Sequence, residues 1–569
     1  MKTSKKMLSL LLIAAMLVSV LCMGVSATGY DPVSISEGEP VTISWSGTTG
    51  TVVSVDGSSY IPRQFILWVR NGFTVSVDGT ALTPNSAPSA DDTDVAYTIN
   101  TNATNAITIV ASNGTTTYTI TCPHYTAIAT GINPVDVNGY LPVGQFARPN
   151  SFGWGALYTD NTNVGSSSND VKFKTGYVST GVSLGMAGGY VQFDMGNNRI
   201  QNNANNKYGI DFIVYGNAFV GNPEAAGVQV SNDGVNWYTL AGSRHYMTGT
   251  KWNQNISYVR LNAANKTLNS AFTAAGIYVS TDFVAPSSDN ASDVDAAIGT
   301  ATWTGIPQLT GSTYPKTYST ATPAAAAWWP EYASGENYGN VWNIDNAVNG
   351  VSWLRNGTAE VITYTGITTV EDDMVVLNKG ATAAPSQAQM TDVYQWGYAD
   401  VRVNGSAYGT AINPYASAAS VGNGGDGFDL SWAVKADGTP IALSSVRYVR
   451  VYSAVLFSAG VFGETSAEVC GLYVANGDGS GAATTTPTVK VGTSTVTTSN
   501  MGTVTKKVYS ATTKATVTSG AENIYVNGEK VTSGTEITFS TPSGSTNYVQ
   551  VITQSGTEAP YITMVKITR

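Results

Sequence analysis

Short runs in which apolar and polar residues alternate recur along the chain, and turn residues follow many of them. Residues 53–57 and 75–79 share the sequence Val-Ser-Val-Asp-Gly, and residues 118–122 read Tyr-Thr-Ile-Thr-Cys. A two-residue period is that of a strand with one buried face. No stretch shows the period of an amphipathic helix of useful length. The pattern predicts an all-β protein, with a small immunoglobulin- or cadherin-like sandwich over residues 28–125.

The strongest hairpin signal lies at residues 228–240, where two alternating runs flank Asp233 and Gly234. Asp-Gly between such runs is typical of a type I′ turn, which needs positive φ at both central residues. We therefore expect a tight two-residue turn at this point.

The second half of the chain contains a shorter echo of this hairpin. Lys435-Ala-Asp-Gly again precedes a strand-like run, at residues 446–452. Two sandwiches would explain the echo, but we favour one large jelly-roll-like sandwich over residues 126–478, with a long insertion at about 284–390. Residues 479–487 have the Gly- and Thr-rich composition of a linker. The alternation that resumes over residues 488–569 predicts a second small sandwich.

The first residues carry the signature of a secretory signal peptide. Three lysines precede an apolar run over residues 7–21, and residues 25–27 offer a small-residue cleavage site. We expect residues 1–27 to be removed and the protein to be secreted or non-covalently associated with a cell surface. A lipoprotein anchor at Cys22 is the weaker alternative, because Leu21 stands where a small residue is needed. No later apolar stretch is long enough to be a transmembrane segment.

The net charge of the chain disfavours some classes of partner, and its cysteine content indicates whether disulfides stabilise the fold. The chain has 28 basic and 38 acidic residues, and loss of the three signal-peptide lysines leaves a balance of −13. An acidic surface disfavours nucleic acid and anionic membranes. Cys122 and Cys470 lie far apart in the sequence, and we interpret both as buried small residues rather than as a disulfide.

Acidic residues gather in two stretches near the end of the large domain. Asp426 and Asp429 lie in a glycine-rich sequence, and Glu464 and Glu468 precede a strand-like run at residues 470–474. Calcium takes six to eight oxygen ligands from carboxylates, carbonyls and water on flexible loops. These acids therefore predict a structural calcium site. The alternative is that Asp426 begins a turn and that Glu468 is a hydrogen-bonded residue at a strand edge.

Exposed aromatic rings are the groups with which many β-sandwiches hold sugars, because the C–H faces of a sugar stack on them. The aromatic candidates lie in loop-like sequence or just before a strand; they are Trp328, Trp329, Trp396, Tyr398 and Tyr415. His245, shortly after the hairpin, is a further candidate for a ligand contact. For each of these residues the alternative is packing in the core or at a corner.

The motif at residues 231–237, Ser-Asn-Asp-Gly-Val-Asn-Trp, and the run Tyr-Val-Arg-Leu at 258–261 together resemble galactose-binding-like (discoidin-type) β-sandwiches. Residues 466–473 resemble the closing strand of those domains, where a glutamate often ligates calcium beside the ligand loops. The resemblance implies that Glu468 is the leading metal ligand. The calcium loop that opens such domains has its nearest match at 346–350, where an asparagine replaces the expected acid. At most one such site is therefore implied.

A broader set of motifs resembles a family of bacterial cell-surface proteins. The set consists of residues 211–219, 228–234, 425–433 and 463–471. It spans roughly residues 170–475, which favours a single large domain. The resemblance implies a secreted or surface location and brings no established activity with it.

The sequence favours binding over catalysis. Phosphate-binding loops, zinc-protease motifs and nucleophile elbows are absent from it. A glycosidase needs only two carboxylates, for which Glu224, Asp400 and Glu464 are candidates, but the sequence sets no two of them at the required distance. We predict a non-catalytic protein that recognises an extracellular glycan or another surface ligand. A structural or adhesive protein that binds protein partners is the main alternative.

Overall fold

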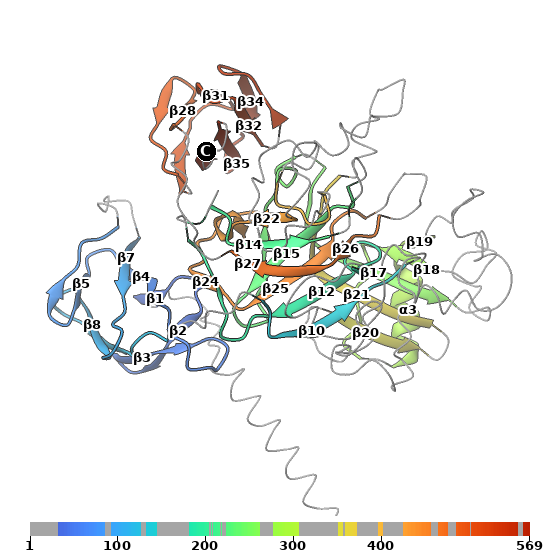
Figure 1. Cartoon of the computed structure of the whole chain (residues 1–569), viewed down its shortest axis with the longest axis horizontal. Helices are drawn as coiled ribbons and strands as arrows, with labels where there is room; N and C mark the ends of the chain where they lie inside the picture. Colours follow the sequence, from blue (N-terminus) through green and yellow to red (C-terminus); the bar gives the residue numbers. More distant parts are fainter. Residues whose placement is uncertain are drawn as a thin grey trace, which may run out of the picture. The chain divides into compact units, whose positions relative to one another are not determined.

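The computed structural model describes residues 32–85, 93–126, 133–144, 181–203, 206, 209–216, 218, 223–247, 249–261, 277–288, 290–305, 351–356, 359–371, 396–401, 425–456, 465–475, 485–500, 502–527, 529–555 and 561–569. These residues are mostly β-strand (Figure 1), which confirms the all-β prediction. The helix α3 (Ala291–Thr300) is an exception. In the described part of the chain, no helix is long and apolar enough to cross a membrane.

The chain divides into two compact units. The first consists of Met1–Ser36, Val41–Val53 and Arg63–Tyr125. The second consists of Glu37–Pro40, Ser54–Pro62 and Thr126–Arg569. Two short segments from the N-terminal hundred residues therefore belong to the second unit.

The first unit is built from two sheets. One has the strand order β1-β4-β7, formed by Val33–Ile35, Gln64–Arg70 and Asp94–Asn100. The other has the order β2-β3-β9-β8-β5-β6, formed by Val41–Ser46, Thr49–Ser54, Thr117–Cys122, Ile107–Ser112, Thr74–Val77 and Thr80–Ala81. In β4 the buried residues are Phe65, Leu67 and Val69, so the alternation in the sequence matches the alternation of burial.

The second unit contains one large antiparallel sheet and several smaller ones between residues 136 and 474. The large sheet has the order β10-β12-β25-β15-β16-β23, formed by Asp136–Leu141, Tyr190–Asp194, Tyr448–Ser453, Ala226–Ser231, Tyr238–Leu240 and Ala433–Val434. A three-stranded sheet has the order β22-β14-β27, formed by Asp426–Phe428, Phe212–Tyr215 and Gly471–Val474.

The remaining sheets of this region are two strand pairs and a five-stranded sheet. The pairs join β11 (Val182–Ser183) to β26 (Glu468–Val469), and β13 (Ile200–Gln201) to β24 (Ser445–Val446). The five-stranded sheet has the order β19-β18-β17-β21-β20, formed by Thr304–Gly305, Ile277–Ser280, Lys251–Leu261, Ala359–Thr369 and Val351–Asn356.

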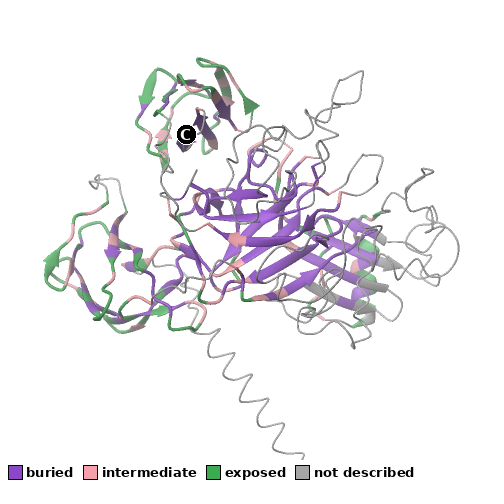
Figure 2. Cartoon of the chain, in the orientation of Figure 1, coloured by how far each residue is buried: buried purple, intermediate pink, exposed green. Residues whose placement is uncertain are grey.

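One hydrophobic core joins these sheets. It includes Phe212 of β14, Val451 of β25 and Tyr364 of β21. Figure 2 shows that the strands of this region are largely buried, and in β15 every residue is buried. A strand that is covered on both faces does not need alternating polar positions. This explains why periodicity alone outlines the central strands less clearly than those of the first unit.

Residues 488–568 form two further sheets of the second unit. One has the order β29-β28-β31-β34, formed by Ser494–Val496, Thr488–Val491, Thr512–Thr518 and Glu536–Ser540. The other has the order β30-β36-β35-β32-β33, formed by Gly502–Lys507, Tyr561–Thr568, Thr546–Gln554, Asn523–Val526 and Glu529–Lys530. Most of their apolar residues form a separate core, but Tyr525, Ile552 and Ile562 belong to the central core.

The hairpin at Asp233-Gly234 is present, but the predicted type I′ turn is wrong. Residues 232–237 connect β15 to β16, and positive φ occurs at Gly234 (74°) but not at Asp233. The carboxylate of Asp233 instead accepts hydrogen bonds from the backbone N–H groups of Val235 and Asn236, each at 2.8 Å. This side-chain turn competes with a tight backbone turn and lengthens the connection.

Both cysteines of the described chain, Cys122 and Cys470, are buried, and neither forms a disulfide bond there. Their burial confirms the prediction that both are small buried residues. Burial raises the pKa of the Cys122 thiol to about 12. The fold therefore depends on packing and on polar networks rather than on a covalent link.

The second unit contains a buried network of ion pairs. Asp56 binds Arg199, and the same carboxylate oxygen lies 2.9 Å from Arg447. Two nitrogens of Arg447 also bind Asp194, each at 2.8 Å. Burial by itself raises the pKa of Asp56, but hydrogen bonds such as that from Ser54, together with the charge of Arg199, hold it well below its usual range.

We expect Asp56→Asn to destabilise the protein by about 3–5 kcal/mol, because the guanidinium of Arg199 would stay buried without its counter-charge. The side chains of Asp56 and Arg199 are 2% and 1% exposed. Glu536→Gln is the matched control, since the Lys514–Glu536 pair is more than half exposed and should cost less than about 1 kcal/mol. Urea unfolding measures both. Equally small losses would show that the buried pair contributes no more than a surface pair.

Candidate functional site

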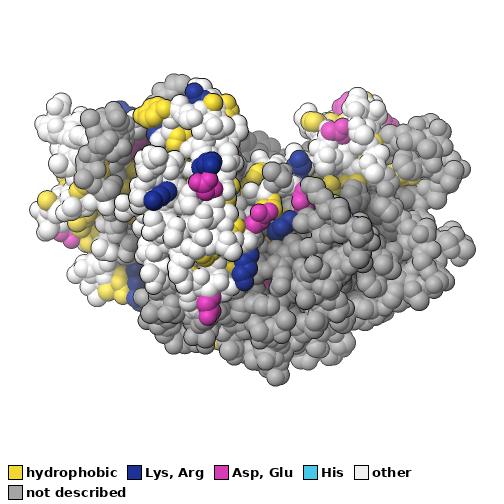
Figure 3. Space-filling model, turned by 90° about the horizontal axis from the view of Figure 1, so that it is seen from above, with side chains coloured by type: hydrophobic (Ala, Val, Ile, Leu, Met, Phe, Trp, Pro, Cys, Tyr) yellow, Lys and Arg dark blue, Asp and Glu magenta, His cyan; other side chains and the backbone are white. Residues whose placement is uncertain are grey.

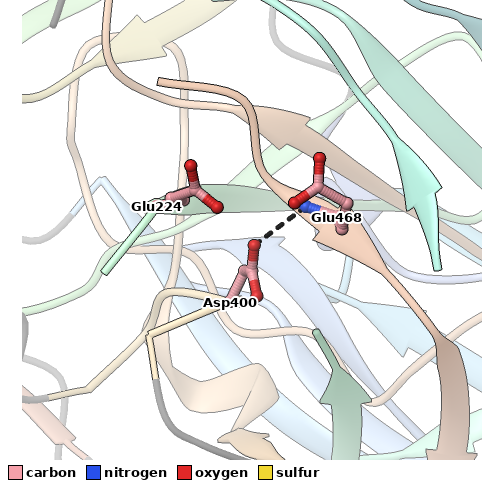
Figure 4. A group of neighbouring side chains, drawn as sticks. All are labelled: Glu224, Asp400 and Glu468. Carbon is pink, nitrogen blue, oxygen red and sulfur yellow. Dashed lines mark hydrogen bonds between the residues drawn. The ribbon is translucent and has the colours of Figure 1, made fainter. Parts of the chain in front are cut away.

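Three carboxylates from distant parts of the sequence meet in the second unit. Glu224 precedes β15, Glu468 opens β26, and Asp400 follows Ala399, which forms a β-bridge with Ala226. Ligand atoms of the three acids all lie within 4.8 Å of one another. Figure 4 shows the carboxylates turned toward one another.

Asp400 is the residue on which the geometry of this cluster depends. Its φ of 58° lies in the left-handed region that few non-glycine residues adopt. Its carbonyl accepts the backbone N–H of Glu224 at 3.0 Å, and its carboxylate accepts the backbone N–H of Glu468 at 2.8 Å. Position 216 has to be glycine, because a Cβ there would lie 2.2 Å from Asp400 Oδ1. The three acids are thus fixed by backbone contacts as well as by packing.

Strand pairing and two hydroxyl groups orient Glu468. Ser183 in β11 stands opposite Glu468 in β26. The hydroxyl of Ser183 donates to Glu468 Oε1 at 3.0 Å, and that of Ser466 donates to the same oxygen at 3.4 Å. The carboxylate is therefore held toward Asp400 and Glu224 rather than toward solvent.

Burial raises the pKa of Glu468 well above its usual range, and the nearby charges of Glu224 and Asp400 raise it further. Glu468 is 3% exposed and Asp400 is fully buried, whereas Glu224 is partly exposed. Three negative charges at this spacing in a poorly hydrated region require either protons or a cation. Carboxylate and hydroxyl oxygens are the donors that a hard cation such as Ca²⁺ prefers, so the residues present fit this ion.

The other acids predicted as metal ligands have separate environments. Asp426 lies in the buried strand β22 rather than in a turn, and it accepts the backbone N–H of Val401 at 3.2 Å. It therefore supports the segment that carries Asp400. Asp429 caps the short 3-10 helix η7 (Leu430–Trp432) by accepting the backbone N–H of Ser431 at 2.8 Å. Glu464 lies outside the described residues.

Asp429 lies beside a different acid, Asp211, and not beside the three clustered carboxylates. Burial, and then the charge of Asp429, raise the pKa of Asp211 above its usual range, and burial raises the pKa of Asp429 to about 6. Three donors bind the Asp211 carboxylate: the backbone N–H groups of Asn203 and Leu430, and the amide of Asn206. These contacts tie β14 to the start of η7, which indicates a structural role.

Three of the predicted ligand contacts lie in the core. Trp396 is 3% exposed, Tyr398 is 1% exposed, and His245 is fully buried. The rings of His245 and Tyr398 stack at 5.3 Å, and the Tyr398 hydroxyl is hydrogen-bonded to His245 Nδ1 at 2.8 Å. Stacking on a sugar needs an exposed ring face, so this burial favours packing roles. Trp328, Trp329 and Tyr415 lie outside the described residues.

Sequence reasoning did not connect Glu224 and Asp400 with Glu468. It named Glu224 and Asp400 only as acids that a glycosidase could use. The pairing of the segment at 399–400 with the segment at 224–226 brings them together. No spacing rule along a single strand or helix could have indicated that contact.

Comparison with known proteins leaves the family open. No protein-family model and no curated protein matches the chain. Among solved structures, one similar chain is named SusE-like protein BT2857. It shares 10% identity, and the alignment covers 72% of this chain and 92% of that one, with a TM-score of 0.15. A similarity at this level carries no argument about fold or function, so the function has to be inferred from the site itself.

Burial lowers the pKa of His245 to about 3, whereas an unfolded histidine titrates near 6.5. Below pH about 6.5 the unfolded chain binds a proton that folded His245 does not bind. The free energy of unfolding should therefore decrease as the pH is lowered from about 6.5 to 3, by up to roughly 1.4 kcal/mol per pH unit. Urea unfolding at several pH values should show this slope, and His245→Gln should flatten it. His124→Gln, which removes the other histidine of the chain, should keep the slope. A wild-type slope in His245→Gln would show that another group is responsible.

Proposed function

We propose that this chain is a secreted or cell-surface protein that recognises an extracellular glycan without catalysis, and that its central domain holds a structural calcium ion. The observation that carries the calcium assignment is the convergence of Glu224, Asp400 and Glu468 within 4.8 Å. Glycan recognition rests on the sequence and on the chemistry of the surface. These two parts of the proposal can be tested separately.

A divalent cation would compensate the repulsion among the three carboxylates better than protonation alone. Protonation of Glu468 removes one charge and leaves Glu224 and Asp400 facing each other. Calcium would balance two of the three charges and accept oxygens from all three side chains. We expect it to hold together the segments around Glu224, Asp400 and β26, and so to order the loops that adjoin them.

The surface has the character of a protein that binds neutral, hydroxyl-rich ligands. Only 12% of the residues are charged, and Ser, Thr, Asn and Tyr recur throughout. On the face drawn in Figure 3, the described Lys, Arg, Asp and Glu side chains are scattered rather than gathered into a patch of one sign. Because three predicted aromatic contacts are buried, we assign the sugar-stacking role to Trp328, Trp329 and Tyr415.

A carboxylate-dependent glycosidase is the second candidate, because such catalysis uses two neighbouring carboxyl groups, one of them with a raised pKa. Against it stands the burial of Asp400 and Glu468, since a glycosidic bond must reach both catalytic groups. An adhesive protein that binds protein partners remains the other alternative. Binding of calcium and glycan without any hydrolysis of the glycan would favour the proposal over the enzyme.

Calcium should raise the melting temperature of the chelator-treated, full-length protein, because the ion binds the folded state only. At a calcium concentration of about 100 Kd, the gain in the free energy of unfolding would be roughly 2.7 kcal/mol. Glu468→Gln keeps the shape of the side chain but removes its charge, and it should abolish most of the gain. Asp437→Asn is the control, since Asp437 is an exposed turn residue outside the cluster, and it should keep the full gain. An unchanged gain in Glu468→Gln would remove the cluster from consideration as the site.

A glycan array with the full-length protein tests recognition directly. We expect binding to a defined set of glycans in calcium and weaker binding in chelator. Replacement of Trp328 and Trp329 by alanine should reduce binding by about tenfold, because stacking contacts are lost. Trp303→Ala is a suitable control, since Trp303 packs beside Phe283 under α3. An array without signal, combined with capture of a protein ligand, would favour the adhesive alternative.

A further inference from the structure

Residues 396–400, which we call the Asp400 segment, are held between two other parts of the second unit. On one side the backbone groups of Ala399 and Ala226 exchange two hydrogen bonds, of 2.8 and 3.0 Å. On the other side the segment contacts residues 241–247, which follow β16 and which we call the supporting loop. This second contact is made by residues outside the acid cluster.

Backbone N–H groups of the supporting loop donate directly to the Asp400 segment. The N–H of Ser243 donates to the carbonyl of Trp396 at 3.1 Å, and the N–H of Arg244 donates to the hydroxyl of Tyr398 at 3.0 Å. The same hydroxyl is hydrogen-bonded to Nδ1 of His245. Tyr398 thus links two residues of the supporting loop to the Asp400 segment.

The backbones of the two segments lie in close contact, and two glycines make this possible. A Cβ on Gly397, whose φ is 78°, would lie 2.4 Å from Gly242 Cα. A Cβ on Gly242 would lie 2.6 Å from the carbonyl oxygen of Trp396 and equally close to the ring of Tyr398. Because a close-packed interior transmits a shift of one segment to its neighbour, the supporting loop fixes the position of the Asp400 segment.

The geometry of the acid cluster depends on where this segment lies. Tyr398 is two residues before Asp400 in the sequence. The Asp400 carbonyl accepts the backbone N–H of Glu224, and its carboxylate accepts that of Glu468 (Figure 4). A shift of the segment would therefore change the separation of all three acids. Groups that orient metal ligands in this way contribute strongly to metal affinity.

We propose that the supporting loop regulates the cation affinity of the acid cluster, with Tyr398 and His245 as positioning residues. This inference rests on the proposed calcium function and adds to it the part of the chain that controls the site. The loop holds Asp400 where it can share an ion with Glu224 and Glu468. A bound ion in turn stabilises the contact between the loop and the Asp400 segment, because the coupling free energy between two sites acts equally in both directions.

Calcium titration of the chelator-treated, full-length Tyr398→Phe variant tests the role of the loop. Phenylalanine keeps the ring but removes the hydroxyl that binds Arg244 and His245. The dissociation constant for calcium should rise by about tenfold, as is usual when a group that orients a metal ligand is lost. Isothermal titration calorimetry well below the melting temperature measures this constant on folded protein, so a loss of stability alone does not change it.

Tyr561→Phe is the matched control. Tyr561 lies in β36 and is 4% exposed, and its hydroxyl is hydrogen-bonded to that of Thr498 at 3.0 Å. This variant also loses the hydroxyl of a buried tyrosine, but it should bind calcium as tightly as the wild type. An unchanged constant in Tyr398→Phe, or an equal rise in both variants, would overturn the inference and leave the calcium proposal standing. A wild type that binds no calcium would overturn both.

Hydrogen exchange in the full-length wild type tests the same coupling without a substitution, and so whether or not the variant folds. Calcium should slow the exchange of backbone amides in a peptide that covers the supporting loop, because two of these amides donate to the Asp400 segment. A peptide that covers β4 of the first unit is the control and should exchange at the same rate with and without calcium. Equal rates in the loop peptide, at a calcium concentration that saturates the protein, would contradict the proposed coupling.

Discussion

The backbone and side chain of Asp400 make the contact on which the functional region depends. The Asp400 carbonyl binds Glu224, its carboxylate binds the N–H of Glu468, and its left-handed backbone places both acceptors at once. Glu224 and Glu468 are more than two hundred residues apart in the sequence, so no local segment of the chain holds them together. A strained backbone conformation at a point where charges converge is typical of a site with a role beyond packing.

Buried charge elsewhere in the second unit is compensated in a different way. Arg450 is 2% exposed and lies over the ring of Trp237, with its guanidinium carbon 3.9 Å from the ring centroid. Burial lowers its pKa to about 10, which leaves it cationic at neutral pH. Asp56 has two arginine partners. In the acid cluster, by contrast, the groups that shift the pKa of Glu468 are other carboxylates and two serine hydroxyls. This contrast is the physical reason to expect an added cation there.

The sequence predicted the fold class well because strand periodicity is a local property. In β4 the alternation of residue types coincides with the alternation of burial. The turn at Asp233-Gly234 was predicted in the right place with the wrong geometry, because the carboxylate of Asp233 competes for the backbone N–H groups of the turn. Local sequence therefore located the hairpin but could not decide between two local hydrogen-bonding solutions.

The candidate site was predictable only in part. The resemblance to galactose-binding-like domains singled out Glu468, and the structure places it in the acid cluster. Its two partners depend on long-range strand pairing, which residue spacing does not encode. The glycine-rich sequence around Asp426 suggested a loop, yet Asp426–Phe428 is a buried strand. Loop-like sequence likewise did not reveal that Trp396 and Tyr398 are buried, since exposure depends on what the rest of the chain places over them.

Binding of one cation by Glu224, Asp400 and Glu468 together can be observed by anomalous diffraction from crystals of the full-length protein grown with calcium. We expect a peak between the three side chains, with a carboxylate oxygen of each at about 2.3–2.6 Å, the usual range for calcium. A map without a peak, in which the carboxyl groups are bonded only to each other and to Ser183 and Ser466, would contradict joint binding of a cation.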